Sequence, residues 1–187
     1  MVQRFMKVAA AALVALGGVT ASATPVTYNI DETMGAGSVI GTIETDGKTG
    51  VLSTSDILAF TLTLSVGAGK TPLTIIDGVN SADDVVGNAL TATSSALDFN
   101  FSGSGAAIFQ LPYVGAAGMN YFCVEGVGVN CTGNGNGADS VNVAGVGLHK
   151  IDSGVVQIGS AVPEPASLPL VGVALLGLSL ARKKKRA

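Results

Sequence analysis

The C-terminal end of this chain combines a long uncharged segment with a block of positive charge. No ionisable side chain occurs in residues 166–181, and the next five residues are all basic. A helix over this segment would reach roughly 24 Å, slightly less than the hydrocarbon core of a bilayer at about 30 Å. Basic side chains can close that gap by extending to the interface. The pattern predicts a transmembrane helix at 166–181. The cytoplasmic bias of basic residues predicts that the end of the chain stays inside. This basic end is Arg182, Lys183, Lys184, Lys185 and Arg186.

A short proline motif, Pro163-Glu164-Pro165, precedes the apolar segment. Two prolines this close do not both fit inside a regular helix, which predicts an extended stem outside the membrane. In the order of motif, span and basic end, residues 162–187 resemble the PEP-CTERM sorting domain of exported proteins from Gram-negative bacteria. The departure from that pattern is small, because lysine outnumbers arginine in the basic end.

The resemblance implies recognition by a membrane-embedded processing enzyme, an exosortase. It also implies cleavage near Pro163–Pro165, with the inner membrane as an intermediate. The protein would then pass to the outer surface or extracellular matrix, with exopolysaccharide as a candidate partner. The resemblance covers only residues 162–187, and a plain C-terminal membrane anchor is the alternative.

Residues 1–23 have the pattern of a secretory signal peptide. Arg4 and Lys7 precede an apolar stretch at Val8–Val19, and Ala21-Ser22-Ala23 forms an A-x-A cleavage site. We therefore expect passage through the secretion translocon, removal by signal peptidase, and a mature chain that begins at Thr24. An uncleaved N-terminal anchor is the alternative, but the apolar stretch is short for one.

The segment between these two ends, residues 24–161, has the length of one domain and is strongly acidic. It contains three lysines against twelve carboxylates, a formal charge of −9. Nucleic-acid binding needs a basic patch, so this composition disfavours it. Tryptophan is absent and aromatic residues are few, so aliphatic residues are expected to fill most of the core.

Alternation of apolar and polar residues predicts an all-β domain, an antiparallel β-sandwich or jelly roll. The clearest case places Phe60, Leu62, Leu64 and Val66 on one face. Glycine-rich turns separate the short runs. The predicted strands are Val26–Ile30, Val39–Thr45, Phe60–Val66, Leu97–Phe101, Ala107–Leu111, Tyr121–Val124, Val141–Leu148 and Val155–Ile158.

Three local features carry more specific predictions. Ser81 could cap a short helical turn over Ser81–Val86. The apolar parity reverses at Gly145, which predicts a β-bulge there. Residues Gly41–Ser53 are similar to a stretch near the N-terminus of some PEP-CTERM passenger domains, and Asp46-Gly47 within it predicts a hairpin turn.

Cys123 and Cys131 are the two cysteines of the chain. An exported domain folds in an oxidising compartment, which favours a disulfide between them. The alternative is a pair of thiolate metal ligands, but the sequence offers no matching set of partners.

Calcium is the one cofactor that the sequence leaves open. Asn134, Asn136 and Asp139 place oxygen ligands along a glycine-rich loop, and Asp83-Asp84 forms a second acidic pair. Calcium takes six to eight oxygen ligands, yet such residues are also ordinary turn chemistry. A solvated turn is therefore the competing interpretation.

No catalytic motif is found. His149 is the only histidine, and a nucleophile–histidine arrangement would have to use it. The sequence therefore predicts a non-enzymatic exported protein, structural or adhesive, at the envelope or in the extracellular matrix. The alternatives are a calcium- or carbohydrate-binding module and, third, a hydrolase.

Overall fold

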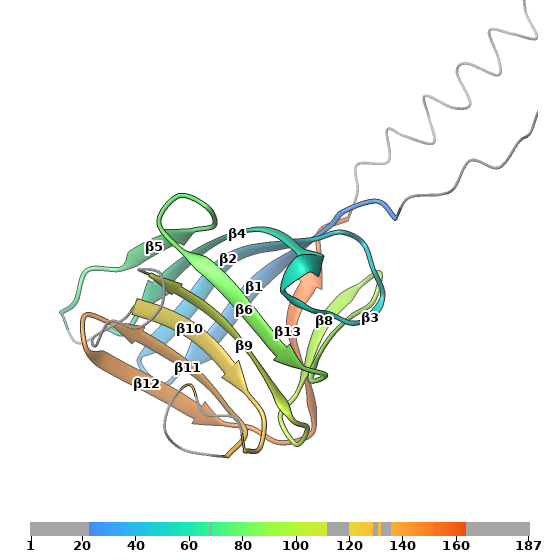
Figure 1. Cartoon of the computed structure of the whole chain (residues 1–187). Helices are drawn as coiled ribbons and strands as arrows, with labels where there is room; N and C mark the ends of the chain where they lie inside the picture. Colours follow the sequence, from blue (N-terminus) through green and yellow to red (C-terminus); the bar gives the residue numbers. More distant parts are fainter. Residues whose placement is uncertain (1–22, 68, 112–119, 129–130, 132–135, 164–187) are drawn as a thin grey trace, which may run out of the picture.

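The computed structural model describes residues 23–67, 69–111, 120–128, 131 and 136–163. These residues form two facing antiparallel sheets, seen as two layers in Figure 1. The all-β prediction is therefore confirmed for this part of the chain. The predicted transmembrane helix at 166–181 and most of the signal peptide lie outside it. No helix among the residues described here is long and apolar enough to cross a membrane.

The larger sheet, sheet A, has eight strands and the smaller, sheet C, has five. In spatial order, sheet A consists of β3 (Gly50–Val51), β7 (Leu90–Ala92), β8 (Ala96–Asn100), β13 (Val155–Ala161), β1 (Val26–Met34), β2 (Gly37–Thr45), β4 (Ile57–Ser65) and β5 (Leu73–Ile76). Sheet C consists of β12 (Val146–Ile151), β11 (Ala138–Val143), β10 (Asn120–Glu125), β9 (Gly105–Leu111) and β6 (Ala82–Gly87).

The predicted alternation decides which side chains face the interior. On β4, Phe60, Leu62 and Leu64 are buried, while Thr61 and Thr63 lie on the outward face. Successive side chains of a strand point to opposite sides, so the period-2 pattern becomes one buried and one exposed face. The hydrophobic side chains of both sheets then close a single core between the layers.

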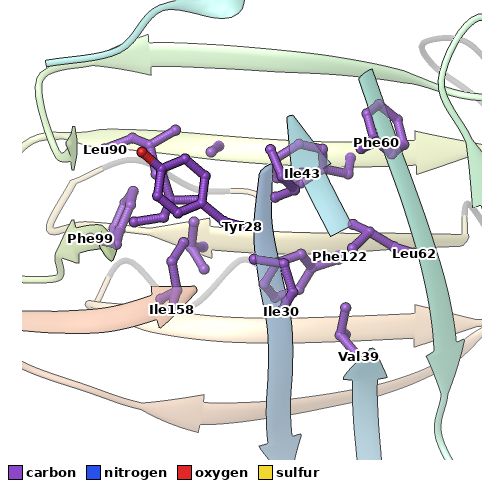
Figure 2. Close-up of a cluster of buried hydrophobic side chains, with 14 of the residues drawn as sticks. Tyr28, Ile30, Val39, Ile43, Phe60, Leu62, Leu90, Phe99, Phe122 and Ile158 are labelled. Carbon is purple, nitrogen blue, oxygen red and sulfur yellow. The ribbon is translucent and has the colours of Figure 1, made fainter. Parts of the chain in front are cut away.

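Aromatic side chains contribute more to the core than composition suggested. All five phenylalanines of the domain are buried, and Tyr28 is buried with them. Phe60 from sheet A meets Phe109 from sheet C edge to face, with ring centroids 5.0 Å apart. Figure 2 shows Phe60, Phe122 and Tyr28 within this cluster, surrounded by aliphatic residues. Edge-to-face pairs of this kind add to the stabilisation from buried area.

The segment Ser81–Val86 is not a helix. It forms most of β6, which pairs with β9 along its whole length, from Ala82 opposite Gln110 to Gly87 opposite Gly105. Pairing with a neighbouring strand satisfies its backbone groups, and this outweighs the capping potential of Ser81. The one helical turn in the described residues is a 3-10 turn at Thr54–Asp56.

The parity reversal at Gly145 marks a hairpin turn rather than a bulge. Ala144 and Gly145 both have positive φ, 52° and 80°, and they link β11 to β12 with Val143 opposite Val146. Two residues with positive φ are the signature of the tight turns that suit twisted hairpins. The predicted strand Val141–Leu148 is therefore parts of two strands joined by a turn.

The expected hairpin at Asp46-Gly47 does not form either. After the turn, the chain enters β3, which pairs with β7 at the far edge of sheet A, whereas β2 pairs with β1 and β4. Glycine is still required at position 47. Its φ is 84°, and a Cβ there would lie 2.0 Å from the carbonyl oxygen of Thr24.

Candidate functional site

The first and last strands of the domain are neighbours. β1 pairs with β13 antiparallel, with Tyr28 opposite Ala161 and Asn29 opposite Ser160. Beyond the strand, the Val162 amide donates a hydrogen bond of 2.8 Å to the Thr27 carbonyl oxygen. Both ends of the folded domain therefore leave from the same end of the sandwich, as Figure 1 shows for the start of β1 and the end of β13.

A loop between β7 and β8 supports this end of the sandwich. The Tyr28 hydroxyl donates a hydrogen bond of 2.6 Å to the Thr93 carbonyl oxygen. The Ala161 amide donates one of 2.9 Å to the Ser95 carbonyl oxygen. Between these elements lies a hollow of about 580 Å³. We call it the junction hollow, and its lining residues are Pro25, Val26, Thr27, Ser94, Ser95, Ala161, Val162 and Pro163.

The junction hollow lies where both predicted processing signals meet the domain. Ala23 and Thr24, at the predicted signal cleavage site, directly precede β1. Pro163 of the predicted sorting motif is the last residue that the structure describes. Ala21, Glu164, Pro165 and the basic end 182–186 lie outside the described ranges, so their predicted roles remain predictions.

The two cysteines form a disulfide. Cys123 belongs to β10, and its sulfur is bonded to that of Cys131 in the following loop. The Glu125 carboxylate accepts a hydrogen bond from the Cys131 amide. Glu125 and both sulfurs are close enough to hold a metal ion, but sulfurs bonded to each other are not thiolate ligands. The disulfide prediction is the one that this geometry supports.

Among the described residues, the predicted calcium ligands do not come together at one site. Asp83 and Asp84 are adjacent on β6, so their side chains point to opposite faces of the strand. Asn134 lies outside the described ranges, and Asn136 is exposed in the loop before β11. Asp139 is buried inside the sandwich, where its partner is a lysine.

That lysine, Lys150, is the centre of a charged cluster that sequence reasoning missed. Its Nζ lies 3.0 Å from an oxygen of Asp152, 3.4 Å from Asp139 and 3.9 Å from Glu32. Glu32 comes from β1 of sheet A, whereas Asp139 and Lys150 come from β11 and β12 of sheet C. This inter-sheet cluster therefore links the two layers near the open edge at β12.

One sequence signal could have revealed part of the cluster. Glu32 has the same parity along β1 as Tyr28, Ile30 and Met34, all of which are buried. A carboxylate on the inward face of a strand needs a partner, because burial of an unpaired charge is costly. The sequence does not say which residue supplies that partner.

Three carboxylates against one ammonium leave the inter-sheet cluster with excess negative charge. Burial raises the pKa of Glu32 to about 7, and Lys150 offsets this only in part. Burial likewise raises the pKa of Asp139 to about 6. Burial alone would lower the pKa of Lys150, but its hydrogen bond to Asp152 and the nearby carboxylates raise it overall.

His149 is exposed in β12, opposite Ser140 in the β11 ladder. The Ser140 hydroxyl is buried and donates a hydrogen bond of 3.2 Å to the Cys123 carbonyl oxygen. The residue opposite His149 on the neighbouring strand is thus a serine whose hydroxyl already donates a hydrogen bond to the backbone.

Comparison with known proteins bears on the C-terminal end alone. The family model of the PEP-CTERM protein-sorting motif matches residues 161–185. No curated protein matches the chain, and no solved structure does. The match begins at the last residue of β13, so the motif starts where the sandwich ends. It marks an exported, membrane-transiting protein that an exosortase sorts to the cell surface. The chain is therefore a PEP-CTERM domain-containing protein.

Proposed function

We propose that this protein is a structural or adhesive component of the cell envelope or extracellular matrix, without catalytic activity. Signal peptidase removes residues 1–23, and exosortase cuts near Pro163–Pro165. The basic end at 182–186 holds the tail in the inner membrane until that cut. The freed β-sandwich is then retained at the outer surface or in exopolysaccharide.

The position of the motif supports this order of events. β13 is central in sheet A, between β8 and β1, and within the described part of the chain Val162 makes the final backbone hydrogen bond of the sandwich. A cut beyond Pro163 leaves in place every strand that the structure describes. The domain can therefore fold before processing and keep its fold afterwards. A domain that its tail holds in the membrane only until cleavage requires this.

The outward face of sheet A supports the adhesive role. Asn29, Thr42 and Thr61 form one row across β1, β2 and β4, and Thr63 meets Thr74 on β5 with hydroxyl oxygens 3.1 Å apart. Hydroxyl and amide groups on one face of a sheet can exchange hydrogen bonds with the hydroxyls of a polysaccharide. We call this face the hydroxyl face.

Intact mass of the protein from an exosortase-containing host tests the sorting proposal. The expected chain starts at Thr24 and ends within the motif, without the residues that follow it. A variant with Pro163-Glu164-Pro165 replaced by three alanines should keep its tail and stay in the membrane fraction. Tail-bearing protein, with Arg182–Arg186 attached, in material shed from the cells would contradict the proposal.

Binding to the host's exopolysaccharide tests the adhesive role separately. We expect the processed protein to sediment with the polysaccharide, and a Thr42→Lys/Thr61→Lys double variant to be retained at least about tenfold less. Thr91→Lys on β7 of the same sheet is the matched control, because it lies away from this array. Equal retention of all three proteins would reject the hydroxyl face as the adhesive surface.

A further inference from the structure

We propose that Glu32, Asp139 and Asp152 form a calcium site, in which the ion occupies the place that the Lys150 ammonium holds in this structure. This goes beyond sorting and adhesion. It also differs from the loop site that the sequence suggested, because Asp139 alone is common to both sets.

The first support is the convergence of three carboxylates on one point. The Lys150 Nζ lies within 3.0 to 3.9 Å of an oxygen of each acid, so a single cation already sits among all three. Calcium–oxygen distances are about 2.3–2.6 Å. The carboxylates would need to approach by about 0.5–1.5 Å, which side-chain rotation supplies.

The second support is charge. The three carboxylates carry three formal negative charges, of which the Lys150 ammonium balances one, whereas a divalent cation in its place balances two. Lys150 is able to turn, because its side chain is 40% exposed on the edge strand β12. Asp139 cannot escape to water in the same way, because its side chain is only 1% exposed.

The third support is independent of the ion pairs. Asp139 Oδ1 is buried and accepts no hydrogen bond from the residues described, whereas Oδ2 faces Lys150. A buried carboxylate oxygen without a donor is costly and calls for an explanation. A metal ion bound by Asp139 would satisfy this oxygen as a ligand.

Water can complete the coordination. Glu32 also lines a hollow of about 290 Å³ together with residues of β1 and β13. Asn29, Asp31, Gln157 and Ser160 contribute polar groups to this hollow. Calcium accepts six to eight oxygens in flexible geometry, whereas magnesium requires short bonds in a near-ideal octahedron. Ligands from two sheets and three separate segments therefore suit calcium better.

Calcium titration of the full chain in detergent tests the site. We expect millimolar calcium, added after EDTA treatment, to raise the melting temperature by at least about 3 °C, with a smaller effect of magnesium. Glu32→Gln should weaken calcium binding, measured by calorimetry, at least about tenfold. Lys150→Met removes the competing ammonium, so it should be destabilised in EDTA, rescued by calcium, and bind calcium more tightly than the natural protein.

Lys48→Met is the matched control, because Lys48 pairs with the single carboxylate of Asp56 at 2.7 Å. Calcium should not rescue that variant. The proposal fails if calcium leaves the melting temperature of the natural protein unchanged, or if Glu32→Gln responds as strongly as the natural protein. That second comparison decides the matter even where Lys150→Met does not fold.

Discussion

The backbone amide of Val162 donates a hydrogen bond of 2.8 Å to the carbonyl oxygen of Thr27, which joins the first and last segments of the domain. The sorting-motif match begins at residue 161, so this bond lies at the boundary between passenger and tail. β13, just before it, is an interior strand of sheet A. The domain thus depends on β13, and among the described residues its hydrogen bonds extend as far as Val162, within the matched motif.

Two truncations separate these roles. A chain of residues 24–163 should unfold cooperatively, at a melting temperature within about 2 °C of the full-length protein, because it keeps every strand that the structure describes. A chain that ends at Gly154 lacks β13 and leaves β1 and β8 without their shared partner. We expect it not to fold, as measured by circular dichroism and thermal melting. Failure of 24–163 to fold would show that the tail belongs to the domain.

Gly41 in β2 should be the least tolerant glycine of the sheet. Its φ is 156°, and a Cβ there would lie 2.0 Å from the carbonyl oxygen of Thr61 on the neighbouring strand. Backbone cannot move aside as a flexible side chain can, so Gly41→Ala should lower the free energy of unfolding by about 3 kcal/mol. Urea denaturation measures this change.

Gly147 in β12 provides the matched control for Gly41. Its added Cβ would meet only the side-chain amide of Asn142, at 3.2 Å. That amide can shift, so Gly147→Ala should change stability by less than about 1 kcal/mol. Similar losses for the two variants would argue against the close approach of β2 and β4 at Gly41.

The disulfide should contribute measurably because it closes a loop in the unfolded chain. Cys123 and Cys131 are 8 positions apart in the sequence. In the chain-entropy account, such a loop corresponds to about 2–3 kcal/mol of stability. The Cys123→Ala/Cys131→Ala variant should lose this amount in urea denaturation. Reducing agent should destabilise the natural protein similarly and leave the variant unchanged; equal effects on both would contradict the prediction.

The sequence predicted best where a strong local pattern coincided with the tertiary environment. β4 has both alternation and β-branched residues, and its buried face is the predicted one. The sorting motif is likewise local in sequence, and its match is confirmed. The prediction for Ser81–Val86 was wrong because it rested on Ser81 as a helix cap, whereas the pairing with β9 that makes this segment a strand is supplied only by the fold.

The charged cluster was beyond local reasoning for a different reason. Glu32 and Asp139 lie more than a hundred residues apart and meet only because β1 and β11 face each other across the sandwich. No periodicity within one strand encodes which strand of the other sheet lies opposite. The glycine-rich neighbours of Asp139 predict a loop site, whereas the fold places this residue in the interior.

Asp83 gives the stability of the domain a pH dependence with a defined sign. Burial, and secondarily the charge of Asp77, raises its pKa from 3.8 to about 6. The folded state therefore binds a proton more tightly than the unfolded state between about pH 4 and pH 6. The contribution of Asp83 to stability is greatest below that range and falls as the pH rises through it, because the folded chain must then hold a buried carboxylate. Asp83 Oδ2 accepts no hydrogen bond from the residues described, and a backbone hydrogen bond to the carboxylate offsets the cost of burial only in part.

Asp83→Asn should remove this loss. At pH 8 the variant should be more stable than the natural protein by about 1–2 kcal/mol, a value reduced from the full linkage because the side chain is partly exposed. At pH 4 the two proteins should be nearly equal. Asp84→Asn, on the exposed face of the same strand, should change stability by less than about 0.5 kcal/mol at either pH. Urea denaturation at both pH values measures these differences. The same pH profile for Asp83→Asn and Asp84→Asn would show that the carboxylate of Asp83 is hydrated rather than buried. Asp83 would then not lie on the inward face of β6.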